Sequence, residues 1–397
     1  MNYITALGRV SEVKGENYLW QDLRARMILD PEKAKEQYRT APANLRKLLD
    51  AFASGINYYL HTHPSVKPQL LTRFEPWMHL LFSEGSIGGD IASISLEDLK
   101  KFHNLNERGA VSDDLRHEQQ GSNGFAIAPF KSTTGNALFY INPHTTFYFR
   151  SEIHMVSKEG LNAYGAATWG QLFLYQGFNA HCGWMHTSSN ADVIDRYRES
   201  VVRKPEGIFY RYDGGERKME LRKHLIRVLR NGRMDEVELP SYRTHHGPVI
   251  AGEGETWITI RMMDDPVNAV LQSFMRTRAE GYDSFLKTMA LRTNSSNNTV
   301  YADDKGNIAY WHGNFMPKRD PAIDWSGIVD GSTSSTEWKG LHDHTLFCRY
   351  FRQTRTKSGS SLHWRFEGHL HSRFYYRKRR KLSRRTRCQS PDFGRVK

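Results

Sequence analysis

The chain has 397 residues, of which 39% are hydrophobic and 12% aromatic, so it can bury a sizeable core and has room for two or three domains. It contains no run of 18 apolar residues, which excludes a transmembrane helix. Its three cysteines lie far apart, which excludes a disulfide framework and a CxxC zinc site. The first residues lack the charged-then-apolar order of a signal peptide, so we expect either a cytoplasmic protein or a chain that begins after its targeting segment.

The net charge of +13 is not spread over the chain. Residues 345–397 carry 16 Lys and Arg but only 2 Asp and Glu, whereas the remainder is almost balanced. This basic tail has no apolar period, and we expect it to be a disordered, non-native sequence. The alternative is an arginine-rich arm that binds nucleic acid.

The N-terminal region is predicted to be helical. Residues 31–62 carry an apolar stripe that Pro42 interrupts, and Asp30 before Pro31 is a favourable N-cap. The polar stretch 103–121 has no apolar period and indicates a linker between this region and the next.

Strand-like sequence follows the linker. Aromatic and β-branched residues dominate 122–178, and 197–263 continue as short strands with a hairpin turn expected at Asn231–Gly232. Residues 266–291 return to a helical pattern, and 298–313 read as a hairpin. Because helices and strands are segregated rather than alternating, the pattern favours the α+β class.

Ser122 stands where the linker ends and the first strand begins. A Gly-Ser pair is ordinarily only a turn. If the chain is cut before Ser122, however, that residue carries a hydroxyl and a free α-amine whose pKa is about 7.7–8.0 in model compounds. Nucleophile and general base then sit on one residue, and no separate histidine is required.

Several motifs in a fixed order carry a resemblance to a known family. They are SNGF at 122–125 with NPH at 142–144, GFNAHCGWMHTSSNADVIDRYRES at 177–200, RTHHGPVI at 243–250, and NNTVYADDKGNIAYWHGNFMPKR at 297–319. Upstream, ALGRVSEVKGENYLWQ and LLDAFASGINYYL are similar to that family's smaller chain. The sequence thus resembles the penicillin acylase family of N-terminal-nucleophile hydrolases, over roughly residues 6–344.

The resemblance implies a four-layer αββα sandwich, here expected to be incomplete at its C-terminus and cut short at both ends. It implies a small-chain-like helical region at 1–102, a linker at 103–121, a partial catalytic core at 122–344 and an unrelated tail at 345–397. The precursor would cut itself between Gly121 and Ser122 into two chains. The substrates would be acyl amides such as penicillins or acyl-homoserine lactones, and the location periplasmic or extracellular.

The resemblance also assigns roles to individual residues. Ser122 would attack the amide carbonyl, while the side-chain amide of Asn298 and the backbone N–H of Ser188 would stabilise the oxyanion. His144 would position the α-amine, and Arg319 matches the family's active-site arginine. Outside the family context, these residues read as turn residues or ordinary surface groups.

Calcium is the cofactor that the resemblance implies. Asp192, Asp195 and the backbone carbonyl of Ile194 would bind it as a structural ion, with Asp90 as a candidate for the remote acidic ligand. Without the family context, this DxxD pair reads as a solvated turn.

The acyl group would face Thr145, Gln176 and His186, whose polarity departs from the family's more apolar pocket. A zinc site built from His181, Cys182 and His186 is disfavoured, because no carboxylate stands at a convincing spacing.

Two functions therefore stand. One is an amidohydrolase that matures by self-cleavage. The other is an inactive fragment or binding protein whose basic tail contacts nucleic acid.

Overall fold

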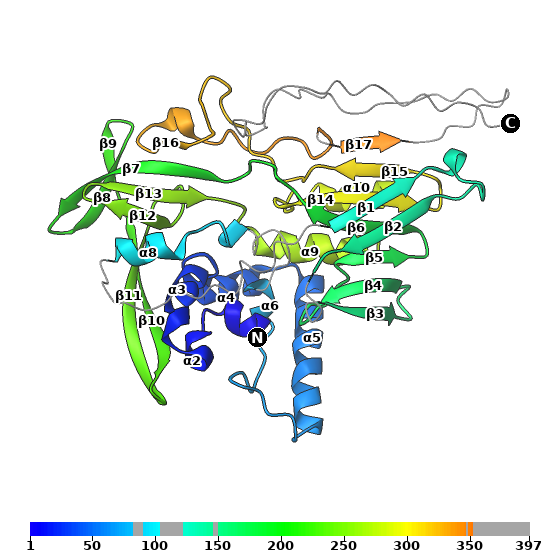
Figure 1. Ribbon diagram of the computed structural model, residues 1–397, viewed down its shortest axis with the longest axis horizontal. Coiled ribbons are helices and arrows are strands. Elements are labelled where there is room, and N and C mark those ends of the chain that lie inside the picture. The colour runs from blue at the N-terminus through cyan, green and yellow to red at the C-terminus, as the bar shows by residue number, and fades with distance from the viewer. Residues whose placement is uncertain (82–89, 104–121, 146–149, 347, 352–397) are drawn as a thin grey trace, which may run out of the picture.

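A computed structural model of the chain describes residues 1–81, 90–103, 122–145, 150–346 and 348–351 (Figure 1). The expected linker and nearly all of the basic tail therefore lie outside the described residues. Within the described ranges no helix is both long and apolar enough to cross a membrane.

The N-terminal region is helical, as expected from the sequence. Pro42 separates two of its helices, and the Asp30 side chain accepts a hydrogen bond from the Glu32 backbone N–H at 2.9 Å, which confirms the predicted cap. The elements before the linker are α1 (Asn2–Ala6), α2 (Ser11–Lys14), η1 (Glu16–Tyr18), α3 (Leu19–Ile28), α4 (Pro31–Thr40), α5 (Ala43–Thr62), α6 (Met78–Leu81) and α8 (Leu96–Phe102).

After the linker, the chain forms a seven-stranded antiparallel sheet (Figure 1). Its strands, in spatial order, are β17 (Cys348–Phe351), β15 (Ile308–Trp311), β14 (Asn297–Asp303), β6 (Cys182–Ser188), β5 (Gln176–Asn179), β4 (Asn162–Thr168) and β3 (Arg150–Val156). The expected 298–313 hairpin is confirmed as β14–β15. Because β17 pairs with β15, the sheet continues past residue 344, where the core was expected to end.

Each face of this sheet has its own cover. The helices α9 (Pro266–Thr277) and α10 (Tyr282–Met289) are the predicted helical segment, interrupted at Gly281. Phe285 of α10 packs with Trp184 and Tyr301 of the sheet in one buried cluster. The other face is covered by the hairpin β1 (Ser122–Ile127) and β2 (Leu138–Pro143).

The order of layers is therefore helix, sheet, sheet, which confirms the α+β class. On the outer face of the β1–β2 hairpin, Phe125 stacks on Tyr140 with ring centroids 4.9 Å apart, and both rings are about half exposed. No second helical layer covers that face among the described residues.

A second sheet and a long hairpin lie toward the other end of the molecule (Figure 1). The sheet comprises β12 (Val249–Glu253), β13 (Thr256–Arg261), β7 (Asp195–Lys204), β8 (Gly207–Tyr212) and β9 (Gly215–Lys218), with β16 (Ile328–Asp330) parallel to β7. The hairpin pairs β10 (Glu220–Arg230) with β11 (Arg233–Arg243).

The long hairpin turns at Asn231 and Gly232, whose φ angles of 49° and 76° confirm the predicted turn. The hairpin packs against the N-terminal helices, because Ile226 and Val228 share a buried hydrophobic cluster with Leu23 of α3.

Candidate functional site

Two glycine contacts hold the β1–β2 hairpin against β6. A Cβ on Gly124 would come within 1.5 Å of the Met185 Sδ, and a Cβ on Gly183 within 2.9 Å of the Phe139 ring. Since no larger residue fits at these contacts, the hairpin lies directly on the central strand of the sheet. Ser122 alternates with Gly124 along β1 and so faces the same strand.

A cleft of about 440 Å³ lies between the hairpin and the sheet, within the usual size of small-molecule sites. Strands β1, β6, β14 and β15 contribute its walls. The lining residues are Ser122, Asn123, Gly124, Phe125, Ala126, Thr187, Val300, Ile308, Ala309 and Tyr310. Ser122 therefore opens on a largely apolar cleft that has few polar side chains.

Asn298 of β14 is buried beside this cleft, and its side-chain amide has a fixed orientation. The Asn298 Nδ2 donates to the Thr187 Oγ1 at 3.0 Å and to the Ser188 carbonyl at 2.9 Å. The Asn298 Oδ1 can only accept, so the His312 Nδ1, 2.6 Å away, must be the donor. The N–H₂ group is thereby directed at Thr187, which lines the cleft together with Ser122.

His312 supports this arrangement from the end of β15. Burial lowers the pKa of its imidazole, which favours the neutral ring with the proton on Nδ1. Neither Thr187 nor His312 was singled out from the sequence. The signal was available for His312, because it alternates with Tyr310 and so shares the face of the sheet that carries Asn298.

Ser188 lies at the end of β6. The next residue, Ser189, donates its backbone N–H to the Ser296 carbonyl at 2.8 Å, and hydrogen-bonded pairs alternate along an antiparallel ladder. The Ser188 N–H therefore points away from β14.

His144 lies just past β2 and is exposed. Its Nε2 accepts from the Asn123 Nδ2 at 3.2 Å and from the Asn142 Nδ2 at 3.4 Å. The ring thus contacts the residue after Ser122, and these bonds give it no direct hold on the serine.

Arg319 is buried against the expected calcium ligands. Its Nε donates to the Asp195 Oδ2 at 2.7 Å and its Nη1 to the Asp192 carbonyl at 2.8 Å. Trp338 donates its indole N–H to the same Asp195 oxygen. Burial raises the pKa of Asp195, and the nearby guanidinium opposes that shift.

These residues do not fit a calcium ion as they stand. Ca²⁺ takes six to eight oxygen ligands, whereas the Asp195 Oδ2 already accepts hydrogen bonds from Arg319 and Trp338. Asp90 accepts from the Ser295 Oγ at 2.6 Å, and burial raises its pKa to about 7. No third acidic, histidine or cysteine side chain joins Asp192 and Asp195 in a cluster within the described ranges.

The residues expected at the acyl pocket are dispersed. His186 lies on the opposite face of the sheet from Ser122. Its ring packs on the Tyr175 ring with centroids 4.8 Å apart, and its Nδ1 forms a hydrogen bond of 3.0 Å with the Thr299 Oγ1. Thr145 is half-buried after β2, and Gln176 is buried in β5. The lining of the cleft includes none of these three.

The disfavoured zinc reading finds no support in the described residues, where His181, Cys182 and His186 form no cluster. His181 lies 3.4 Å from an Asp304 carboxylate oxygen, and burial raises the pKa of the Cys182 thiol to about 12.

The chain is similar in sequence to known proteins. The profile of the penicillin amidase family matches residues 1–352. An acyl-homoserine lactone acylase PvdQ from Pseudomonas fluorescens is 23% identical over 91% of this chain and 54% of its own length. An acyl-homoserine lactone acylase QuiP, from another strain of that species, is 23% identical over 87% of this chain and 48% of its own length.

Among solved structures, a thermostable penicillin G acylase from Alcaligenes faecalis is similar with a TM-score of 0.48 and 21% identity, covering 60% of this chain and 46% of that one. The chain spans about half the length of the curated relatives it matches.

Proposed function

We propose that this chain, which belongs to the penicillin amidase family, carries the nucleophile of a linear amide hydrolase, Ser122. The observation that carries the proposal is the position of Ser122. It begins a strand seated on β6 and lines a cleft with Thr187, to which Asn298 donates a hydrogen bond.

Maturation would cut the bond between Gly121 and Ser122. Gly121 lies outside the described residues, so the support for this step is the position of Ser122 on β1 and the family membership. The cut would release a free α-amine on the residue that carries the hydroxyl, and an amine of ordinary pKa can accept the hydroxyl proton near neutral pH.

The chemistry that follows is acyl transfer in two steps. The Ser122 Oγ attacks the carbonyl carbon of the amide, and its proton passes through the α-amine to the leaving amine, so that an ester to Ser122 forms as the C–N bond breaks. A water molecule then attacks the ester and passes its proton through the α-amine to the Ser122 Oγ, so that the ester bond breaks, the hydroxyl is restored and the carboxylic acid is released.

Oxyanion stabilisation falls to the Asn298 amide and the Ser188 backbone N–H. Both N–H bonds of Asn298 are now donated within the protein, so one must be redirected to the substrate oxygen. Thr187 is the exchangeable partner, because its hydroxyl lies in the cleft and can rotate to another acceptor.

The cleft and the relatives support acyl amides as the proposed substrate class. Val300, Ile308 and Ala309 give it apolar walls suited to an acyl chain rather than a charged group. Two of the matched relatives are acyl-homoserine lactone acylases, so acyl-homoserine lactones are the first substrates to test, ahead of penicillins.

The test combines mass and activity. Intact-mass measurement should find two chains, the second beginning at Ser122, and Ser122→Ala should give one uncut chain with no release of amine from an acyl-homoserine lactone. An uncut, unmodified chain that still hydrolyses the amide would refute the mechanism.

The expected alternative, an inactive fragment with a nucleic-acid-binding tail, rests on the excess of basic residues in 345–397. Binding through that segment would be electrostatic and would weaken steeply as salt is raised. Removing 352–397 should then abolish it without changing amide hydrolysis.

A further inference from the structure

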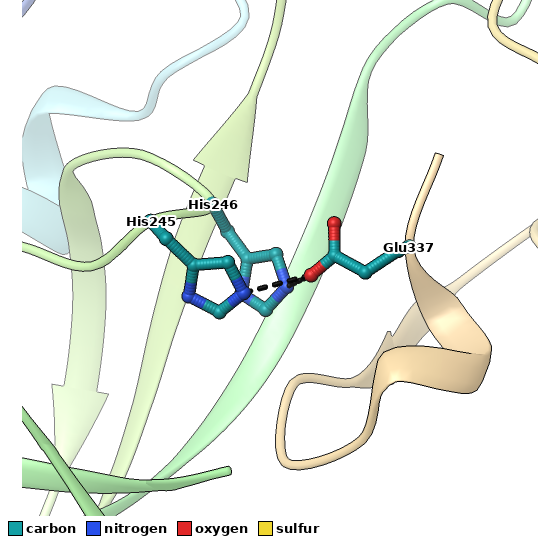
Figure 2. A group of neighbouring side chains, drawn as sticks. All are labelled: His245, His246 and Glu337. Carbon is teal, nitrogen blue, oxygen red and sulfur yellow. Dashed lines mark hydrogen bonds and ion pairs between the residues drawn. The ribbon is translucent and has the colours of Figure 1, made fainter. Parts of the chain in front are cut away.

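The side chains of His245, His246 and Glu337 converge on one point (Figure 2). The two histidines precede β12 and Glu337 follows β16, and these strands lie at the end of the molecule away from the β1–β2 hairpin (Figure 1). The Glu337 Oε1 lies 2.7 Å from the His245 Nε2 and 2.9 Å from the His246 Nε2. Among the described residues, this is the group of three potential metal ligands whose ligand atoms all lie within 4.8 Å of one another.

The backbone fixes the two histidines side by side. Thr244 and Gly247 exchange backbone hydrogen bonds of 3.0 and 3.2 Å across a tight turn, and the adjacent rings lie with centroids 3.8 Å apart and their planes tilted by 38°. Gly247 has a φ of 146°, and a Cβ there would lie 2.0 Å from the Ile260 carbonyl oxygen. The turn that presents both imidazoles therefore requires glycine.

Glu337 reaches the same point from a separate segment, and the residues on each side of it are anchored. The Thr336 hydroxyl donates to the Asp330 carbonyl at 2.6 Å, and the Trp338 indole donates to Asp195. Its carboxylate is consequently held where both rings can reach one of its oxygens.

Each of the three groups has its other polar atom held by a further residue. The His246 Nδ1 lies 2.9 Å from the Oε1 of fully buried Glu199, and the His245 Nδ1 lies 2.9 Å from the Tyr210 hydroxyl. The Arg261 Nη1 donates to the Glu337 Oε2 at 2.7 Å. Metal-binding histidines characteristically have their second nitrogen fixed in this way, which leaves the first lone pair aimed at the ion.

We propose that His245, His246 and Glu337 form a divalent transition-metal site of the zinc type. The ligands would be the two Nε2 atoms and the Glu337 Oε1, with water in the fourth position. The side chain of His245 is about a quarter exposed, which provides an entry path and room for that water. Two imidazoles, one carboxylate and one water are a familiar zinc ligand set.

Metal binding replaces the hydrogen atoms that now lie between these groups. Zinc bonds of about 2.0–2.1 Å in a tetrahedron place ligand atoms roughly 3.3 Å apart, so the present contacts must open by about half an ångström. The proton on the His245 Nε2 moves to its Nδ1 and is donated to Tyr210, while the His246 Nε2 proton leaves to solvent. His246 keeps the Nδ1 proton that it donates to Glu199.

The ion would join the turn before β12 to the segment that follows β16, so its role would be to stabilise this end of the protein. It is independent of catalysis at Ser122. The competing interpretation is a purely hydrogen-bonded network, in which the Glu337 Oε1 accepts from both rings and no metal binds.

The metal site and the purely hydrogen-bonded network can be distinguished by cobalt titration followed by zinc competition. The experiment uses the full chain after chelator treatment. Visible ligand-field absorbance should report one cobalt ion, zinc should displace it, and zinc should raise the melting temperature. His245→Asn and Glu337→Gln should each lower zinc affinity at least tenfold and abolish most of the zinc-dependent shift.

His181→Asn is the matched control, since it removes an exposed histidine beside a carboxylate at another site, and it should bind like the unmodified protein. Equal zinc affinity in the unmodified protein and in both cluster variants, or no zinc binding by the unmodified protein, would overturn the proposal and leave the hydrogen-bonded network.

Discussion

His312 is expected to control the rate of amide hydrolysis through Asn298, although it does not line the cleft. Its Nδ1–H holds the Asn298 Oδ1 at 2.6 Å and thereby directs the amide N–H₂ toward Thr187. His312→Leu removes this donor and leaves a buried carbonyl oxygen without its partner, which costs about 1–3 kcal/mol. The amide is then free to rotate, and its N–H₂ no longer points reliably at the oxyanion.

The size of the effect follows from that cost. If the whole of that free energy appears in the activation barrier, kcat should fall by roughly 5- to 160-fold in His312→Leu, with little change in KM. Asn298→Ala, which removes the donor itself, should lower kcat by about 10²–10³. His312→Asn places an amide N–H close to the former Nδ1 position and should recover most of the lost rate.

The assay is the release of amine from an acyl-homoserine lactone by protein whose cleavage before Ser122 has been verified by mass. Asn297→Ala is the matched control, because the neighbouring side chain alternates to the other side of β14 and kcat should stay within about twofold. A folded, processed His312→Leu variant with unchanged kcat, or a His312→Asn variant no better than His312→Leu, would refute the positioning role.

Three further outcomes are expected. Gly124→Ala should lower the free energy of unfolding by about 1–3 kcal/mol and reduce activity, because the added Cβ collides with Met185 of β6. Gly327→Ala is the control: its added Cβ meets no atom within 4 Å, so chemical denaturation should show no change in stability. Asp195→Asn should lower the melting temperature equally in calcium and in chelator, because the change breaks a buried ion pair with Arg319. If calcium instead stabilises the unmodified protein and Asp195→Asn abolishes that stabilisation, the calcium site is supported again. Removal of 352–397 should leave the melting temperature unchanged and eliminate salt-sensitive binding to nucleic acid, whereas retained binding after the deletion would show that the tail is not responsible.

The sequence alone determined the elements whose causes are local. Asp30, Pro31 and Pro42 set the ends of two helices, and Asn231–Gly232 specified a hairpin turn, because capping and positive φ depend on a few adjacent residues. The segregation of helices and strands was sufficient for the α+β class. The motif order was sufficient for the penicillin amidase family, which the family profile then confirmed.

The tertiary structure decided which of these residues share a site. Because side chains alternate along a strand, His186 lies on the helix-covered face of the sheet and Asn298 on the face toward Ser122. Which face each side chain takes depends on the register of the strands, which the sequence alone did not determine. Likewise, Arg319 meets Asp195 across 124 residues of chain, and Glu337 meets His246 across 91. Such contacts arise only when distant segments pack, so spacing along the chain could propose candidate residues but could not place them together.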